Sequence, residues 1–303
     1  MTPNQEIDLL DLKTYLSEKC DLINSSLDQF LPEESSFPEI IYKAMRYSVL
    51  NGGKRIRPIL SLAGCEAVGG DQNMALPTGC AIELIHAFSL IHDDLPALDN
   101  DDLRRGQPTN HKVFGEAIAI LAGDALFARA FEIIAGRTMG VSAERILDVT
   151  RRIAAAAGTS GMVVGQVVDI ICEGAQVQAD TLAFMHKNKT GAIIEASVVS
   201  GGILGGGSDS QIEALSAYGW MIGQAFQITD DILDIEGDED KIGKPVGSDI
   251  RNEKTTYPSL YGLDKSRELA KQAVIKALTS ISQFDDKAEP LRLIARYIIE
   301  RKS

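Results

Sequence analysis

The chain has 303 residues, 45% of them hydrophobic, and its net charge of −13 makes it strongly acidic. Such a surface repels the phosphate backbone of nucleic acid, so we expect no nucleic-acid partner. The first residues lack the basic and apolar stretches of a signal peptide, and no apolar run reaches the ~18 residues of a membrane span. We therefore expect a cytoplasmic protein without membrane insertion. The four cysteines contain no CxxC pair, which predicts reduced thiols and disfavours a zinc site.

Apolar residues recur at steps of three and four along almost the entire chain, which is the period of amphipathic helices. The expected helices occupy, in chain order, residues 7–31, 37–50, 56–68, 74–91, 117–135, 141–157, 161–172, 193–204, 212–235, 270–281 and 285–301. Glycine and proline separate them, as at Asn51-Gly52-Gly53. No run of useful length favours a strand, and aromatic residues are only 6%, which also disfavours a sheet. We predict an all-α fold, a single bundle of ten or more helices, with one domain over residues 1–303.

Two aspartate clusters each follow an apolar helical run: Asp93-Asp94-Leu-Pro-Ala-Leu-Asp99 and Asp230-Asp231-Ile-Leu-Asp234. At ~100° per residue, the three aspartates of the second cluster share one helical face with Gln227. Like charges on one stripe destabilise a helix unless a cation compensates them. Carboxylate oxygens suit Mg²⁺, which completes its shell with water and substrate phosphates. We therefore predict that both clusters bind a metal–diphosphate complex.

A calcium loop is the competing interpretation of the two clusters. It requires glycine at the sixth position of the loop, where this chain has Arg104 after the first cluster and Glu239 after the second. We therefore favour the magnesium site.

Positive charge gathers at glycine turns, in Gly52-Gly53-Lys54-Arg55-Ile56-Arg57 and in Arg104-Arg105-Gly106. Guanidinium groups match phosphate oxygens, so these turns predict diphosphate capture in an otherwise acidic protein. Two alternatives stay open: the lysines elsewhere only increase solubility, and Arg104 and Arg105 neutralise the aspartates at 99–102. No G-x-x-x-x-G-K-[ST] loop exists, which disfavours a nucleoside triphosphate.

On these residues the chain resembles the bacterial short-chain trans-isoprenyl diphosphate synthases, and most closely the farnesyl diphosphate synthases. The matching strings run in the family's order and include GGKRIRP (52–58), ELIHAFSLIHDDLPALDNDDLRRGQPT (83–109), GMVVGQVVD (161–169), KTGAII (189–194), GQAFQITDDILD (223–234) and GKPVGSDIRNEKTTYP (243–258). The resemblance implies helices around a deep central cavity and a homodimer. Asn188 and Ile171 depart from the family pattern, outside the metal motifs.

The resemblance also implies a role for each matching residue. Mg²⁺, with three ions per active site when substrate is bound, would be held by Asp93, Asp94, Asp99, Asp230, Asp231 and Asp234. The allylic diphosphate would be bound by Arg104, Lys189, Lys244 and Lys254, and isopentenyl diphosphate by Gly53, Lys54, Arg57, His86 and Arg105. Thr190 and Gln227 would point oxygens at the developing carbocation. Catalysis is expected to depend on Asp93, Asp94, Lys189, Thr190, Gln227 and Asp230.

The implied reaction joins isopentenyl diphosphate to dimethylallyl and then geranyl diphosphate by ionisation, condensation and elimination, giving (2E,6E)-farnesyl diphosphate. Phe88 lies five residues before Asp93, about 7.5 Å along the helix axis, where the resemblance implies a floor that limits product length. Around the helix axis, Phe88 is rotated by ~140° from Asp93, whereas Ser89 is rotated by only ~40°. Ordinary core packing therefore stays an alternative role for the Phe88 ring. The alternatives are a geranylgeranyl diphosphate synthase and an inactive regulatory helical subunit. A terpene cyclase is disfavoured by the second aspartate cluster.

Overall fold

The computed structural model describes residues 3–175, 177–236 and 254–300, with side chains from residue 12 onward. The first half contains α1 (Pro3–Phe30), α2 (Glu39–Leu50), α3 (Ile56–Ala67), α4 (Gln72–Asp93), α5 (Asn110–Phe114), α6 (Glu116–Arg137) and α7 (Ala143–Ala157). The second half contains α8 (Met162–Cys172), α9 (Ala179–His186), the π-helical turn η1 (Lys187–Gly191), α10 (Ala192–Leu204), α11 (Asp209–Glu236), α14 (Tyr257–Tyr261), α15 (Leu263–Ser280), the 3₁₀ turn η2 (Asp286–Ala288) and α16 (Glu289–Glu300). The predicted all-α bundle of ten or more helices is confirmed.

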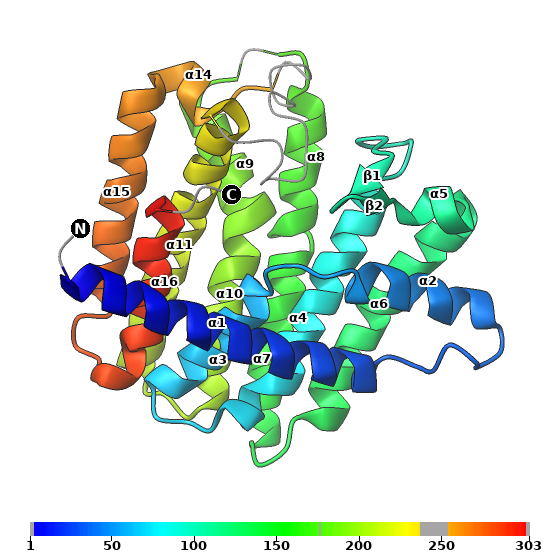
Figure 1. Cartoon of the computed structure of the whole chain (residues 1–303), viewed down its shortest axis with the longest axis horizontal. Helices are drawn as coiled ribbons and strands as arrows, with labels where there is room; N and C mark the ends of the chain where they lie inside the picture. Colours follow the sequence, from blue (N-terminus) through cyan, green and yellow to red (C-terminus); the bar gives the residue numbers. More distant parts are fainter. Residues whose placement is uncertain (1–2, 176, 237–253, 301–303) are drawn as a thin grey trace.

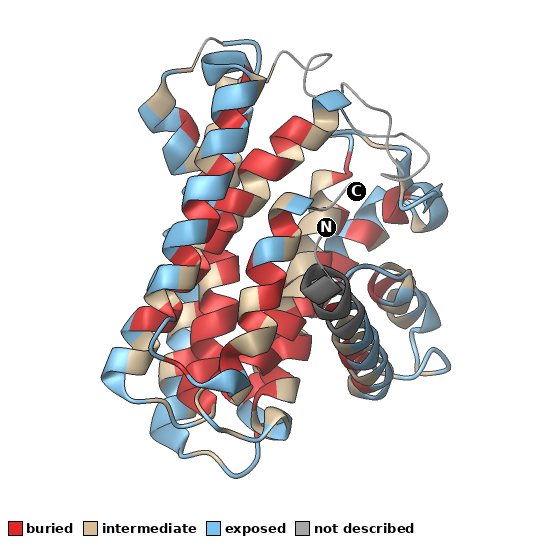
Figure 2. Ribbon diagram, turned by 60° about the vertical axis from the view of Figure 1, so that its left-hand side comes forward, coloured by how far each residue is buried: buried red, intermediate tan, exposed pale blue. Residues whose placement is uncertain are grey.

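The only strands among the described residues form a short hairpin between α4 and α5. Strands β1 (Leu103–Arg104) and β2 (Gln107–Pro108) pair antiparallel, with Arg104 opposite Gln107. Figure 1 shows this hairpin and α14 at the same end of the bundle. Figure 2 shows that buried residues concentrate along the middle helices and that exposed residues cover the outer ones.

Helix α10 forms the centre of the core. It contacts α3, α4, α7 and α11, and every residue in it except Glu195 is buried. A helix that is apolar on all sides has no face for water, so such burial is expected. The approach to α3 is close, because a Cβ at Gly201 would collide with the carbonyl oxygen of Ser61. Gly201 therefore permits the close packing of α10 against α3.

Two helical stretches are long and apolar enough to cross a membrane by composition alone, Gln72–Asp93 and Ala143–Cys172. The earlier expectation concerned uninterrupted apolar runs, whereas this criterion averages hydropathy over 18 residues and tolerates up to two charged ones. The signal is weak evidence for a membrane protein, because the core helices of soluble proteins also give it. In α4, 67% of the apolar window is buried, as expected for a core helix.

The two aspartate motifs lie at the C-terminal ends of α4 and α11. The α4 helix begins at an N-cap, where the Asp71 side chain accepts a hydrogen bond from the backbone N–H of Asn73. It ends at Asp93, and Pro96 follows within three residues, as is common after a helix C-terminus. The α11 helix runs without interruption to Glu236, so Asp230 and Asp234 lie in its last two turns.

Candidate active site

The π-helical turn η1 places Lys189 and Thr190 between α8 and α11. Such turns are rare and frequently occur at functional sites. Gly165 of α8 permits the arrangement, because a Cβ there would collide with the backbone of Lys189. The Thr190 hydroxyl donates a hydrogen bond to Oε1 of Gln227 on α11 (2.9 Å). The two residues predicted to face the carbocation are therefore in direct contact.

Asp169 on α8 is a buried carboxylate that forms ion pairs with two lysines, Lys189 and Lys254. Its Oδ2 lies 2.6 Å from Nζ of Lys189 and 3.3 Å from Nζ of Lys254. Burial alone would raise the pKa of Asp169, but the two ammonium groups outweigh it and lower that pKa below its usual value. Asp169 was not among the predicted site residues, although it ends the matching string GMVVGQVVD (161–169) and lies one helical turn beyond Gly165.

The same cluster reaches the first aspartate motif, because Nζ of Lys254 lies 4.0 Å from Asp99. On the other side, Nε2 of Gln227 donates a hydrogen bond to Asp231 of the second motif (3.1 Å). We call the residues Asp99, Lys254, Asp169 and Lys189 the lysine–aspartate cluster. Through this cluster and the neighbouring Thr190–Gln227 pair, one contact network joins both motifs.

Three further carboxylates of the two aspartate motifs are only partly buried. Asp93, Asp230 and Asp234 have intermediate exposure. Burial raises the pKa of Asp93 to about 6, against smaller opposing effects of Lys189 and Arg104. No three metal-binding side chains of the described residues converge on one point as a ready-made ion site. The partly exposed carboxylate oxygens of Asp93, Asp230 and Asp234 are the ligand type of Mg²⁺, which takes one or two carboxylates and fills its remaining positions with water and substrate phosphate.

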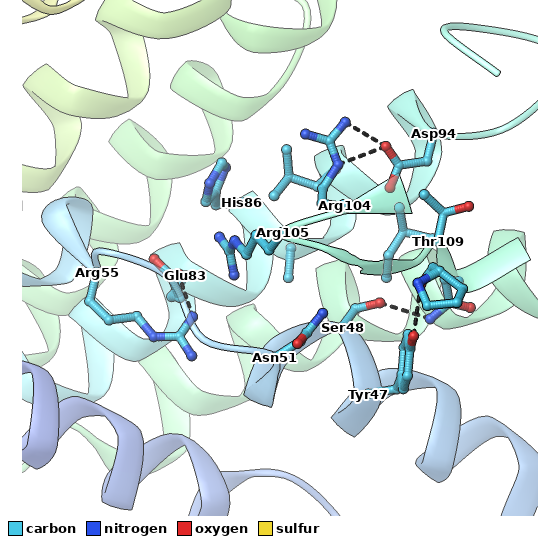
Figure 3. Close-up of a pocket in the computed structure, with 15 residues that line it drawn as sticks. Tyr47, Ser48, Asn51, Arg55, Glu83, His86, Asp94, Arg104, Arg105 and Thr109 are labelled. Carbon is cyan, nitrogen blue, oxygen red and sulfur yellow. Dashed lines mark hydrogen bonds and ion pairs between the residues drawn. The ribbon is translucent and has the colours of Figure 1, made fainter. Parts of the chain in front are cut away.

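The middle carboxylate of the first motif is engaged differently. Asp94 is 3% exposed and accepts a hydrogen bond from Nε of Arg104 (2.7 Å), with a second from Nη2 of the same guanidinium (Figure 3). Arg104 also lies 3.3 Å from Asp101. The alternative in which Arg104 and Arg105 neutralise the aspartates at 99–102 therefore holds only for Arg104 with Asp101, since Arg104 binds mainly Asp94 and Arg105 donates to the carbonyl oxygen of Gly52.

The glycine turn before α3 is fixed by a buried ion pair. Arg55, 3% exposed, donates from Nη1 to Glu83 of α4 (2.7 Å) and from Nη2 to the carbonyl oxygen of Val49 (2.7 Å). Figure 3 shows this pair beside His86. Sequence reasoning missed the pair, although Glu83 lies three residues before His86 on the same helical face. The pair therefore fixes the turn that carries the predicted isopentenyl diphosphate residues.

Those predicted residues surround the turn. Arg105 donates a hydrogen bond to the carbonyl oxygen of Gly52, and its guanidinium packs against Gly53. Lys54 is exposed, whereas Nε of Arg57 is buried and has no hydrogen-bond partner within the described part of the chain. A buried donor left in this way is suited to an anionic ligand.

His86 faces this basic group from α4. Burial and then the positive charges of Arg57, Arg105, Arg104 and Arg55 lower the pKa of His86 well below its usual value. The imidazole is therefore neutral and can donate one hydrogen bond without adding positive charge.

Two cavities open beside these groups. One, of about 110 Å³, is lined by Asp169, Lys189, Gln227, Asp231, Lys254 and His186 among others. The other, of about 30 Å³, lies next to His86, Arg105, Arg55 and Leu90 (Figure 3). The first borders Lys189 and Lys254 of the predicted allylic residues. The second borders His86 and Arg105 of the predicted isopentenyl residues, and also Arg104, which was predicted to bind the allylic diphosphate.

The two predicted chain-length residues lie on α4 above Asp93. The Phe88 ring is half-buried and packs edge-on against His92 (4.8 Å between ring centroids) and in a tilted arrangement against Phe127 of α6 (5.0 Å). The Ser89 hydroxyl donates to the carbonyl oxygen of His86 (2.9 Å). Lys244, the remaining predicted site residue, lies outside the described residues.

The sequence profile of the polyprenyl synthetase family matches residues 38–294. The chain belongs to the polyprenyl synthetase family. A geranylgeranyl diphosphate synthase of Cyanophora paradoxa is 48% identical over 97% of both chains. A chloroplastic geranylgeranyl pyrophosphate synthase of Capsicum annuum is 49% identical over 96% of this chain and 79% of its own length.

Two solved structures are also similar. A geranylgeranyl pyrophosphate synthetase from Pyrococcus horikoshii gives a TM-score of 0.88 at 37% identity, covering 97% of this chain and 99% of that one. An FPP/GFPP synthase from Zymomonas mobilis gives 0.86 at 39% identity, covering 96% and 99%. This polyprenyl synthetase is a trans-prenyltransferase that makes prenyl diphosphates. The resemblance to this enzyme class is confirmed, while the closer resemblance to farnesyl diphosphate synthases is not, because geranylgeranyl synthases dominate the similar proteins.

Proposed function

We propose that this prenyltransferase condenses isopentenyl diphosphate in turn with dimethylallyl, geranyl and farnesyl diphosphate, and that its end product is geranylgeranyl diphosphate. The observation that carries the proposal is the contact network in which the lysine–aspartate cluster includes Asp99 of the first motif and the neighbouring Gln227 binds Asp231 of the second. The C20 product is supported by the names of the similar enzymes.

The donor set fits Mg²⁺, because it consists of hard carboxylate oxygens without a thiolate or imidazole among them. Asp93 and Asp99 at the end of α4, with Asp230 and Asp234 on α11, would hold the ions, three when substrate is bound. When bound, Mg²⁺ supplies Lewis-acid stabilisation of the leaving diphosphate.

The cationic side chains divide between the two substrates. Lys189, Lys254 and Arg104 bind the allylic diphosphate, and Arg57 with Arg105 binds isopentenyl diphosphate beside neutral His86. Lys189 and Lys254 line the larger cavity, whereas Arg105 lines the smaller one beside His86, together with Arg104. This separation of Lys189 and Lys254 from Arg105 supports two distinct anion sites.

The remaining residues act on the carbocation. Thr190 and Gln227 present oxygen atoms that stabilise the positive charge as the allylic diphosphate leaves. Apolar walls of α4 exclude water, which would otherwise trap the cation as an alcohol. The proton lost after condensation passes to the departing diphosphate, so no protein base is required.

A second candidate product is farnesyl diphosphate, and one specific observation favours it. The Phe88 ring is held between His92 and Phe127, so a large side chain occupies the position expected to stop chain growth.

The test incubates the protein with labelled isopentenyl diphosphate, Mg²⁺ and each allylic substrate, and identifies the dephosphorylated alcohols by chromatography. A C20 alcohol supports the first product and a C15 alcohol the second. Absence of any prenyl alcohol from wild-type protein, with a known prenyltransferase active in the same buffer, would overturn the proposed function.

We also infer a cytosolic homodimer. Helix α8 exposes an apolar stripe of Val163, Val167, Ile170 and Ile171 at helical spacing. An exposed stripe of this kind is typical of an interface, and the family resemblance implies a second copy as its partner. Sedimentation should show a dimer, and the double change Val167→Asp and Ile171→Asp should give a monomer. A wild-type monomer would contradict the inference.

A further inference from the structure

The second aspartate motif contains one carboxylate whose surroundings differ from the other two. Asp231 is 3% exposed, whereas Asp230 and Asp234 are half-buried. All three aspartates were predicted to be metal ligands. The structure gives each oxygen of Asp231 a protein donor instead.

The two hydrogen bonds of Asp231 reach different elements. Its Oδ2 accepts from the backbone N–H of Tyr257, the first residue of α14 (2.9 Å, buried). Its Oδ1 accepts from the side-chain amide of Gln227 on the preceding turn of α11 (3.1 Å). A carboxylate that accepts a backbone N–H makes a charge-assisted bond, which is stronger than a neutral one. Asp231 therefore ties the beginning of α14 to α11.

The segment held in this way carries a substrate-binding lysine. Lys254 lies three residues before Tyr257 and reaches Asp169 and Asp99. Between them, the Thr255 hydroxyl donates to the carbonyl oxygen of Ala175 (3.3 Å), and Thr256 caps α14. The position of Lys254 in the site thus depends on where Tyr257 is anchored.

The first motif shows the same division between its two leading carboxylates. Asp94, also 3% exposed, accepts two hydrogen bonds from Arg104, while Asp93 is half-buried. In each motif the first aspartate stays accessible and the second fixes a chain segment that carries a phosphate-binding cation.

We propose that Asp231 is a positioning residue: it holds residues 254–257 and Gln227 in place and does not ligate the metal. The proposal rests on the proposed function only in one respect, namely that Lys254 binds the allylic diphosphate. The anchoring itself is a property of the protein without ligand, and it can be measured there.

The experiment compares Asp231→Asn with Asp230→Asn. Hydrogen exchange of the peptide covering residues 254–261, in the protein without substrate or metal, reports the anchor directly. Asn at position 231 keeps one acceptor and loses the charge, so exchange should become about tenfold faster there. Asp230→Asn should leave exchange in this peptide unchanged.

Steady-state kinetics then separates a positioning role from ligation. Asp231→Asn should raise KM for the allylic substrate about tenfold and leave the Mg²⁺ concentration for half-maximal rate within twofold of wild type. Asp230→Asn should raise that Mg²⁺ concentration at least tenfold. The effects of Asp231→Asn and Lys254→Met on the allylic KM should be less than additive in the double variant, because both act through one segment.

Asp231→Glu provides a second variant if Asp231→Asn does not fold. It keeps a carboxylate for a metal but displaces it by one methylene, so it should show the same faster exchange with an unchanged Mg²⁺ requirement. Unchanged exchange in either folded variant, or a Mg²⁺ requirement raised as in Asp230→Asn, would overturn the positioning role. If wild-type protein makes no prenyl product, the proposed function fails, while the exchange result still decides the anchor.

Discussion

The ammonium of Lys189 lies 2.6 Å from the carboxylate of Asp169, which is almost fully withdrawn from solvent. Asp169 also binds Lys254, so one buried charge fixes two lysines that come from different elements. A lysine has a long flexible side chain, and the ion pair orders that side chain before substrate arrives. Substrate binding therefore costs less conformational entropy.

We predict that Asp169→Asn raises KM for the allylic diphosphate about tenfold and lowers stability by about 1–3 kcal/mol, because a hydrogen-bonded buried charge is removed. The allylic KM and the unfolding free energy in urea measure the two effects. Asp148→Asn is the matched control, since Asp148 pairs with Arg151 and Arg152 in solvent and such pairs contribute only ~0–1 kcal/mol. An Asp169→Asn enzyme with wild-type KM for the allylic substrate would contradict the positioning of the lysines.

The buried pair of Arg55 and Glu83 should be important for the fold of the glycine turn. We predict that Glu83→Gln destabilises the protein by about 3–5 kcal/mol, because it leaves the Arg55 charge buried without its partner. KM for isopentenyl diphosphate should rise more than KM for the allylic substrate, because the turn borders the cavity next to His86. Glu39→Gln is the control, since its ion pair with Lys43 is exposed. Equal stabilities of the two variants would show that the buried pair is not structural.

Stability should depend on pH through His186. Burial lowers the pKa of His186 to about 4, whereas the unfolded side chain titrates near ~6.5. Between these values the unfolded chain binds a proton that the folded protein does not, so stability falls as pH decreases from about 6.5 to 4. The full loss is about 3 kcal/mol. Above pH 7 both states are neutral and the residue has no effect.

Urea unfolding at pH 7.5 and 5.0, in wild type and in His186→Gln, measures this contribution. The variant should lose less stability than wild type over the same interval, because glutamine does not titrate. Parallel losses in the two proteins would mean that His186 takes up a proton in the folded state as readily as in the unfolded one.

Much of this arrangement followed from the sequence, and the exceptions have physical reasons. Helical periodicity predicted the bundle, since burial of an apolar stripe imposes that spacing. The motifs predicted which residues gather at the site. Asp169 and Glu83 were missed, and Arg55 was placed among the phosphate-binding cations of the glycine turn, because their roles depend on partners 20 to 85 residues away, which spacing along one helix cannot reveal. The different roles of Asp230 and Asp231 were missed for the same reason, because the donor to Asp231 comes from Tyr257.

Activity should require a divalent metal and both motifs. We predict that Asp93→Ala and Asp230→Ala each lower kcat by several orders of magnitude, because each change removes a partly exposed carboxylate from the metal–diphosphate complex. Chelation should abolish turnover, and added Mg²⁺ should restore it. Asp180→Ala, at an exposed position on α9, is the control and should keep wild-type rates. Turnover that survives chelation would show that the clusters serve another purpose.

The last prediction concerns product length and the contact between Phe88 and Phe127. The Phe88 ring is directed toward α6, where Phe127 lies 5.0 Å from it and Phe131 continues the row at 5.3 Å. A ring braced in this way cannot move aside easily, so it should stop a growing chain that extends from Asp93 along α4. We predict that Phe88→Ala lengthens the main product by at least one C5 unit relative to wild type, whether wild type makes C15 or C20. Chromatography of the dephosphorylated alcohols measures the change.

Two further variants make the result specific to this contact. Phe127→Ala removes the brace and leaves the Phe88 ring in place, so it should give a mixture of the wild-type product and the longer one. Phe114→Leu alters a ring that packs against Tyr47 instead, and it should leave product length unchanged. If Phe88→Ala yields only the wild-type product while remaining folded, the ring is part of the core packing between α4 and α6, and chain growth ends elsewhere in the bundle.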